Sequence, residues 1–391
     1  MIRKSWMAAF ALALAGAFAP ASAFESRGAI ALVVDHATGL TLYAKNADQP
    51  RPPASMSKLM TLYMLFEALR DGRVTPDSEF IVSAHAQEMG GSRMFLEAGR
   101  KVKVSDLILG IIVQSGNDAC VVVAENLYGS EAAFAKAMTE RAHALGMNET
   151  VLKNASGWPE PGHVMSAEDL VIIARRIIED FPDEYAHFAE TAFTYNGITQ
   201  QNRNPLLTAG LGADGLKTGH TSEAGYGLVG SAVRDGQRIV FVISGLDTLQ
   251  DRAAESAEIV NWAFGAFDTL KLYDAGAEVG QADVWLGAAP TVPLVAGERI
   301  QMLAPRGAAA QAKARIVYDG PVPAPVAAGQ QIGRLVVELP GAEPASFPLL
   351  AGADVPEGGL GVRIKAAGRS ALDRALALFP GSKTAPATAE E

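Results

Sequence analysis

Cysteine is almost absent from this chain of 391 residues, which contains only Cys120. A disulfide within the chain is therefore impossible, and stability must come from packing. Cys120 opens the apolar run 121–124, where a buried structural thiol is expected. A catalytic thiol is the alternative interpretation.

Basic residues are fewer than acidic ones, with 33 Lys and Arg against 43 Asp and Glu. The net charge of −10 at pH 7 speaks against a nucleic-acid partner. The chain has no glycine motif of the phosphate-binding type. The histidines at positions 85, 143, 163 and 187 lack the spacing of zinc ligands. We therefore expect neither a metal nor an organic cofactor.

The apolar run at residues 6–19 is too short for a comfortable membrane span, but it has the parts of a secretory signal peptide. Arg3 and Lys4 precede it, and Ala21-Ser22-Ala23 follows as a small-residue cleavage site. We expect cleavage after residue 23 and a protein that works outside the cytoplasm. An uncleaved anchor is the alternative.

Ser55 and Lys58 stand three residues apart at the start of a strongly apolar run that predicts a helix. Helical spacing would place the hydroxyl and the amine on one face, about one turn apart, with Lys58 at the edge of the apolar stripe. A lysine held near apolar atoms is pushed toward its neutral form, which can take a proton from serine. Because Ser-x-x-Lys is short and common, a capping serine beside an unrelated lysine remains open.

Alternating apolar residues predict five antiparallel strands, for which a helix at 251–267 would cover one face. Two strands form a hairpin within 28–44, and the others lie at 215–219, 226–233 and 238–244, the last two joined by Asp235-Gly236. Residues 105–180 predict an inserted helical subdomain, with Ser105, Ser130 and Ser166 as helix N-caps. The fold class is therefore α+β.

After residue 268 the residue pattern changes to short Val, Ile and Leu runs separated by Gly and Pro. This pattern predicts a small all-β domain at 269–356. Residues 357–380 predict an amphipathic helix with a basic polar face, suited to a membrane surface, although packing on the protein itself is the alternative. A disordered tail is expected at 381–391. The predicted divisions are thus 1–23, 24–268, 269–356, 357–380 and 381–391.

Three short motifs follow one another along the chain. Ser55-Met56-Ser57-Lys58 precedes Ser115-Gly116-Asn117, in a predicted loop between helices, and then Lys217-Thr218-Gly219 on a predicted strand. Each motif is weak alone, but the three in this order are typical of penicillin-binding proteins and β-lactamases. With Phe193–Gly197 and Asn202-Arg203-Asn204, the chain resembles the D-alanyl-D-alanine carboxypeptidases among the low-molecular-mass penicillin-binding proteins.

The resemblance implies a β-lactamase/transpeptidase-like fold and a role for each motif. Ser55 would be the acylated nucleophile and Lys58 its base. Ser115 would pass a proton to the departing D-alanine, and Asn117 would hydrogen-bond Lys58 or the substrate amide.

Further residues would bind the substrate. Lys217, Thr218 and Gly219 would lie on a strand edge that pairs with an extended peptide. His220 would contribute its backbone N–H, with that of Ser55, to an oxyanion hole. Arg203 and Arg252 match family arginines suited to the terminal carboxylate of the peptide, although surface salt bridges are the alternative.

The expected partners are stem peptides ending in D-Ala-D-Ala, β-lactam inhibitors and a membrane surface, and the expected location is the periplasm, on the outer face of the cytoplasmic membrane. A D,D-endopeptidase that cleaves crosslinks is the nearest alternative, since it could share all three motifs. A β-lactamase is less favoured, because Glu149–Asn154 has one residue too many for its Glu-x-x-Leu-Asn motif. A penicillin-binding sensor that barely turns over is the non-enzymatic alternative.

Overall fold

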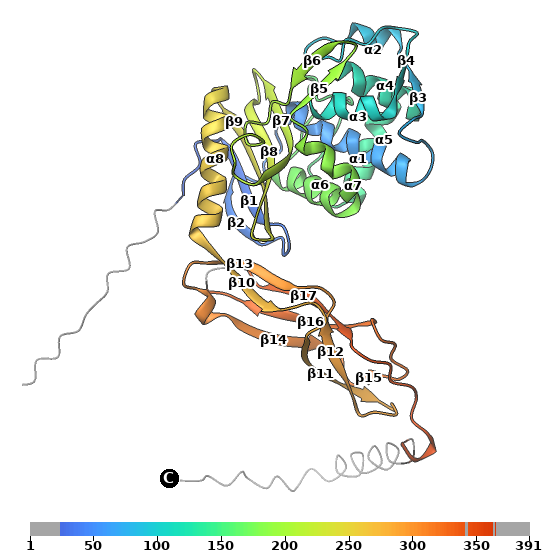
Figure 1. The fold of residues 1–391 in the computed structure, drawn as a ribbon, viewed down its shortest axis with the longest axis vertical. Coiled ribbons are helices and arrows are strands. Elements are labelled where there is room, and N and C mark those ends of the chain that lie inside the picture. The colour runs from blue at the N-terminus through green and yellow to red at the C-terminus, as the bar shows by residue number, and fades with distance from the viewer. Residues whose placement is uncertain (1–23, 341–342, 363, 365–391) are drawn as a thin grey trace, which may run out of the picture.

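A computed structural model describes residues 24–340, 343–362 and 364 of the chain (Figure 1). The predicted signal peptide, the predicted tail and most of the predicted amphipathic helix lie outside the described residues. Within the described part, no helix has both the length and the apolar character needed to cross a membrane.

The predicted five-stranded antiparallel sheet is confirmed, with the strand order β2-β1-β9-β8-β7. Its strands are β1 (Ile30–Asp35), β2 (Thr41–Lys45), β7 (Ala213–Thr221), β8 (Gly225–Arg234) and β9 (Gln237–Leu246). Asp235 and Gly236 both have positive φ, as a two-residue hairpin turn between β8 and β9 requires. Strand β7, which carries Lys217-Thr218-Gly219, lies at an edge of the sheet.

Both faces of the sheet are covered, as Figure 1 shows: α8 (Leu249–Ala266) lies on one side and the helical subdomain on the other. Successive side chains of a strand point to opposite faces. Leu32 and Val34 of β1 accordingly pack in the core that contains the helical subdomain, and Ala31 and Val33 pack in the core that contains residues of α8. Strand β1 is therefore buried along its whole length.

The helical subdomain and its connections contain short elements between β2 and β7. The helices are η1 (Ala54–Ser57), α1 (Lys58–Arg70), α2 (Ala84–Glu88), α3 (Val104–Ile112), α4 (Asn117–Tyr128), α5 (Glu131–Ala144), α6 (Ala167–Asp180), α7 (Pro182–Tyr185) and η2 (Ala186–Ala189). Two small antiparallel pairs are also present: β3 (Glu79–Ile81) with β4 (Lys101–Lys103), and the hairpin of β5 (Ala192–Tyr195) and β6 (Ile198–Gln201). These strands of three or four residues are too short for a clear alternating pattern.

Two of the three predicted N-caps are confirmed. The side chains of Ser130 and Ser166 accept hydrogen bonds from backbone N–H groups in the first turns of α5 and α6. The prediction for Ser105 is wrong, because β4 leads directly into α3 with Lys103 at the N-cap. Ser105 already lies in the first turn of that helix.

The C-terminal β-rich part has a second core, to which Leu40, between β1 and β2, also contributes. Its strands are β10 (Phe267–Tyr273), β11 (Glu278–Trp285), β12 (Thr291–Ala296), β13 (Ile300–Pro305), β14 (Lys313–Tyr318), β15 (Val322–Pro323), β16 (Gln331–Glu338) and β17 (Ala345–Ala351), with the short helix η3 (Ala309–Gln311). Strands β10 and β13 pair with each other, and the others form a sheet in the order β14-β16-β17-β12-β11-β15. Helix α8 continues directly into β10, which joins the two parts (Figure 1).

Candidate active site

Ser55 lies in the 3-10 turn η1, immediately before α1, and not in the first turn of an α-helix. This turn packs against β7. A Cβ atom on Gly219 would lie only 3.0 Å from both Met56 Cγ and the Pro53 carbonyl oxygen. The absence of a side chain on Gly219 therefore lets η1 pack closely against β7.

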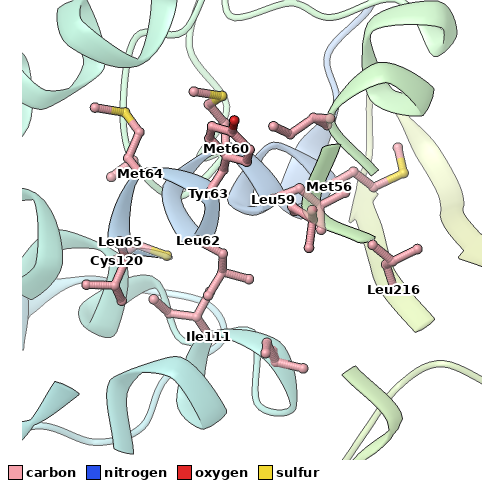
Figure 2. Packing of buried hydrophobic residues seen from close by; sticks show 14 of the residues in the cluster. Met56, Leu59, Met60, Leu62, Tyr63, Met64, Leu65, Ile111, Cys120 and Leu216 are labelled. Atoms are coloured by element: carbon pink, nitrogen blue, oxygen red, sulfur yellow. The ribbon is translucent and has the colours of Figure 1, made fainter. Parts of the chain in front are cut away.

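Lys58 is completely buried at the start of α1. The sequence placed it at the edge of an apolar stripe, but α1 is buried on all sides from Lys58 to Phe66. Figure 2 shows the reason: Met60 and Met64 point to one side of the helix and Leu62 and Leu65 to the other. The helix runs through the middle of the helical subdomain, and the segments packed around it shield Lys58 from water.

Three acceptors surround the Lys58 amine. Its Nζ donates to Ser55 Oγ at 2.9 Å, to Asn117 Oδ1 at 2.7 Å and to the Ser156 carbonyl oxygen at 2.5 Å. Burial lowers the pKa of Lys58 to about 8. The amine is therefore mainly protonated at neutral pH, but its neutral form is close enough in free energy to act as a base toward Ser55.

A second pair of a hydroxyl and an amine lies beside the first. Ser115, with φ of 58°, lies in the loop between α3 and α4, and Lys217 Nζ donates to its Oγ at 3.0 Å. Lys217 is almost fully buried. Burial, and then the charge of Lys58, holds the pKa of Lys217 well below its ordinary value. Lys217 can therefore give a proton to Ser115 Oγ or take one from it.

The two arginines named from the sequence lie together. Arg203 Nη1 donates to Ser92 Oγ at 2.6 Å, and Arg252 Nη2 in α8 donates to the carbonyl oxygen of Arg203 at 3.0 Å. Desolvation lowers the pKa of the exposed Arg203, and it lowers that of the buried Arg252 to about 10. Neither guanidinium has an ion-pair partner among the described residues, so the alternative of surface salt bridges is not supported.

His220 and Thr218 complete the set of residues predicted on β7. Thr218 is buried, and its carbonyl oxygen accepts from Lys217 Nζ at 3.2 Å. The exposed ring of His220 stacks on Tyr226, with 3.9 Å between ring centroids. The imidazole therefore has a packing partner of its own.

Sequence reasoning missed the turn at residues 154–158. Asn154 Oδ1 accepts from the backbone N–H groups of Ser156, Gly157 and Trp158, at 3.2, 2.8 and 3.0 Å. This turn aims the Ser156 carbonyl at Lys58. Gly157 has φ of 74°, and a Cβ there would lie 2.0 Å from the Ala54 carbonyl oxygen. Asn three residues before Gly is a turn signal that could have been noticed.

Asp118 is a second residue that was missed. Its carboxylate accepts from the backbone N–H groups of Met94 and Leu96, at 3.0 and 3.2 Å. The loop at 90–96, which forms one wall of the site, is thus fixed to α4. Among the described residues no group of His, Cys, Asp and Glu side chains could hold a metal ion.

A groove of about 300 Å³ opens onto Ser55. Its walls are formed by three segments: the 90–96 loop, the turn at 154–158 with Pro159, and the end of β7. The lining residues are Ser55, Gly91, Ser92, Asn117, Gly157, Trp158, Pro159, His220, Thr221 and Ser222. An extended peptide can reach the Ser55 hydroxyl along this groove.

Known families account for nearly all of the described chain. Residues 17–248 match the family described as D-alanyl-D-alanine carboxypeptidase, Peptidase_S11, and residues 267–357 match the C-terminal domain of penicillin-binding protein 5. D-alanyl-D-alanine carboxypeptidase DacD of Escherichia coli is 36% identical over 85% of this chain and 88% of its own length. DacA of Haemophilus influenzae is 37% identical over 84% and 85%.

Solved structures agree with the sequence relatives. Penicillin-binding protein 5 of Haemophilus influenzae is 36% identical, with a TM-score of 0.77 over 86% of this chain and 100% of that one. Penicillin-binding protein D2 of Listeria monocytogenes, solved in an ampicillin-bound form, is 30% identical, with a TM-score of 0.53 over 60% and 97%. With the motifs, the fold and the length of these matches in agreement, the chain belongs to the D-alanyl-D-alanine carboxypeptidases of the low-molecular-mass penicillin-binding protein family.

Proposed function

We propose that this chain is a serine-type D-Ala-D-Ala carboxypeptidase that removes the terminal D-alanine from peptidoglycan stem pentapeptides. The observation that carries the proposal is the unbalanced positive charge around a serine nucleophile. Burial is the main cause of the lowered pKa of Lys58 and Lys217; the charge of Arg203 lowers both further, and Arg252 acts on Lys217 in the same direction. The terminal carboxylate of a peptide supplies the missing negative charge, and guanidinium groups suit it geometrically.

In this reaction, Ser55 Oγ attacks the carbonyl carbon of the penultimate D-alanine while its proton passes to Lys58 Nζ. The C–N bond then breaks, the departing D-alanine takes a proton from Ser115 Oγ, and Lys217 Nζ, at 3.0 Å, restores that proton. Water then hydrolyses the ester by the reverse path: its proton passes through Ser115 Oγ to Lys217 Nζ, and Lys58 Nζ returns its proton to Ser55 Oγ. The backbone N–H groups of Ser55 and His220 form the oxyanion hole, which is typically worth about 2.7–4 kcal/mol per donor.

Product analysis tests this proposal. A stem pentapeptide should release free D-alanine in the steady state, and amidation of its terminal carboxylate should lower kcat/KM about a hundredfold or more, because Arg203 and Arg252 then lose their anionic partner. Equal turnover of the acid and the amide, or cleavage of crosslinked dimers at a similar rate, would favour an endopeptidase. Acylation by penicillin without turnover of peptide would favour a sensor.

We further propose that β-lactams acylate Ser55. Solved structures of penicillin-binding protein D2 of Listeria monocytogenes contain ampicillin and cefotaxime. Locating the adduct of a β-lactam by mass spectrometry tests this directly, and an adduct on any peptide other than the one containing Ser55 contradicts it.

We also propose the division into a peptidase domain at 24–268 and a β domain at 269–356, export to the periplasm, and attachment of helix 357–380 to the outer face of the cytoplasmic membrane. The sequence of this segment combines arginines at 363, 369 and 374, a residue type that suits anionic lipid headgroups, with leucines at 372 and 376, which suit an apolar interface.

Removal of residues 360–391 should move the protein from the membrane fraction to the soluble fraction and leave D-alanine release unchanged. Fractionation of cells that express the full and the shortened chain measures this. The anchor is wrong if both chains fractionate alike.

A further inference from the structure

One end of the C-terminal β-rich part carries almost no charge. Three segments form this end, residues 285–290, 320–329 and 355–359, and we call them together the uncharged tip. Glu357 is the only charged residue in these segments, whereas charged residues make up 19% of the whole chain. Figure 1 shows β11 and β15 at this end, away from α8 and the helical subdomain. The tip is therefore remote from the groove that opens onto Ser55.

Backbone pairing holds the three segments of the tip together. Trp285 pairs with Pro323 in the parallel ladder of β11 and β15, and the carbonyl oxygen of Trp285 accepts from the N–H of Ala324 at 2.9 Å. Two isolated antiparallel bridges join the remaining segments, Val326 to Val355 and Gly287 to Glu357. The three segments consequently form one continuous surface.

The surface of the tip is apolar. Trp285, the last residue of β11, is 42% exposed. Around it the exposed residues are prolines and alanines: Ala288, Pro290, Pro321, Pro323, Pro325, Ala327, Ala328 and Pro356. Asp354 lies just outside the tip, and its Oδ1 accepts from the N–H of Ala328 at 2.8 Å. An exposed apolar patch of this kind marks a surface that contacts a protein or a membrane.

The path of the chain favours a membrane. The chain leaves the tip at Leu360, which is 77% exposed, and continues into the segment proposed to attach to the membrane. The tip itself has no basic residue, so its contact would be apolar, and the arginines of that segment would supply the attraction to anionic headgroups. Tryptophan is also the side chain most typical of the boundary between headgroups and acyl chains.

We propose that the uncharged tip is a second membrane contact, with Trp285 inserted at the boundary between lipid headgroups and acyl chains. This inference rests on the proposed attachment of residues 357–380 and adds a surface of the β-rich part to it. A single amphipathic segment leaves the protein free to tilt over the lipid. Contact by the tip as well restricts that tilt and holds the groove on the side away from the membrane (Figure 1).

A fluorescent label on the tip tests the contact directly. Ala288→Cys in the chain 24–391 can be labelled with an environment-sensitive dye, because Cys120 is buried and should not react. Vesicles of phosphatidylethanolamine and phosphatidylglycerol should shift the emission of this label to the blue, and a nitroxide lipid should quench it. The same label at Ala132→Cys, an exposed position of α5, should show neither change.

Substitution of Trp285 measures what the contact contributes to binding. Trp285→Ala should weaken partition into the same vesicles about tenfold, and Trp285→Phe should weaken it less. Leu249→Ala is the matched control, since Leu249 is 51% exposed on α8, and it should partition like the wild type. Release of D-alanine from a soluble peptide should be the same in all of these variants.

The outcomes separate the tip from the attachment on which it rests. Equal partition of the wild type and Trp285→Ala, or a label at position 288 that stays in water while the protein sediments with vesicles, would overturn the tip as a lipid contact. The attachment of residues 357–380 would then stand, and the tip would be assigned to a protein partner. A full chain that does not sediment with vesicles at all would contradict both the attachment and the tip.

Discussion

Ser55→Ala is expected to release no measurable D-alanine and to form no adduct with a β-lactam. Loss of the nucleophile in a serine hydrolase lowers kcat by a factor on the order of 10⁶, since no other group in the site can form the acyl-enzyme. Lys58 keeps two of its three acceptors in this variant, Asn117 Oδ1 and the Ser156 carbonyl oxygen. We therefore expect the fold to be retained.

Ser57→Ala is the matched control for Ser55→Ala, because it removes a hydroxyl from the same turn. Ser57 Oγ donates to the Ala54 carbonyl oxygen at 3.0 Å and has no part in the proposed reaction. The Ser57→Ala substitution should lower the free energy of unfolding by about 1 kcal/mol, and the variant should keep most of the activity. D-Alanine release by Ser55→Ala at the wild-type rate would refute the mechanism.

Lys58→Met is expected to slow acylation by about 10²–10⁴, the range for loss of a general base. Methionine has nearly the volume of lysine, so the buried position stays filled. The Asn117 and Ser156 oxygens lose a donor, which costs about 1–3 kcal/mol of stability for each unpaired group. Thermal unfolding therefore has to accompany the stopped-flow measurement of β-lactam acylation.

The dependence of the acylation rate on pH shows whether Lys58 acts as a base or has only a structural role. Because burial lowers the pKa of Lys58 to about 8, the neutral form grows as the pH rises through that value. Acylation by the wild-type protein should therefore rise with pH and level off above about pH 8, and Lys58→Met should lose this limb. A rate that is flat or falling between about pH 6 and pH 9 would assign the proton transfer to another group, with Lys217 the first candidate.

Local signals explain which features were predictable from the chain alone. The Asp235-Gly236 turn and the caps at Ser130 and Ser166 depend on residues within four positions of one another, and all three were predicted. Ser105 failed as a cap because a short strand, which has almost no pattern of its own, runs into the helix from Lys103. The order of the three motifs also required no structure, and it indicated the chemistry.

The surroundings of the reacting atoms depended on contacts between distant segments. Ser156 is 98 residues from Lys58, and Ser115 is 102 residues from Lys217, yet each pair is within hydrogen-bond distance. No periodicity or spacing reports such a contact, and for that reason the turn at 154–158 was missed.

The amino-acid sequence by itself therefore determined the family and the five-stranded sheet and singled out Ser55 as the proposed nucleophile, since motif order and side-chain alternation are properties of the chain. Only the tertiary structure decided how deeply Lys58 is buried, what pairs with Lys217, and that Arg203 and Arg252 lack a carboxylate partner among the described residues. Protonation states and unbalanced charge arise from the desolvation and proximity of segments far apart in sequence, and folding alone brings those segments together.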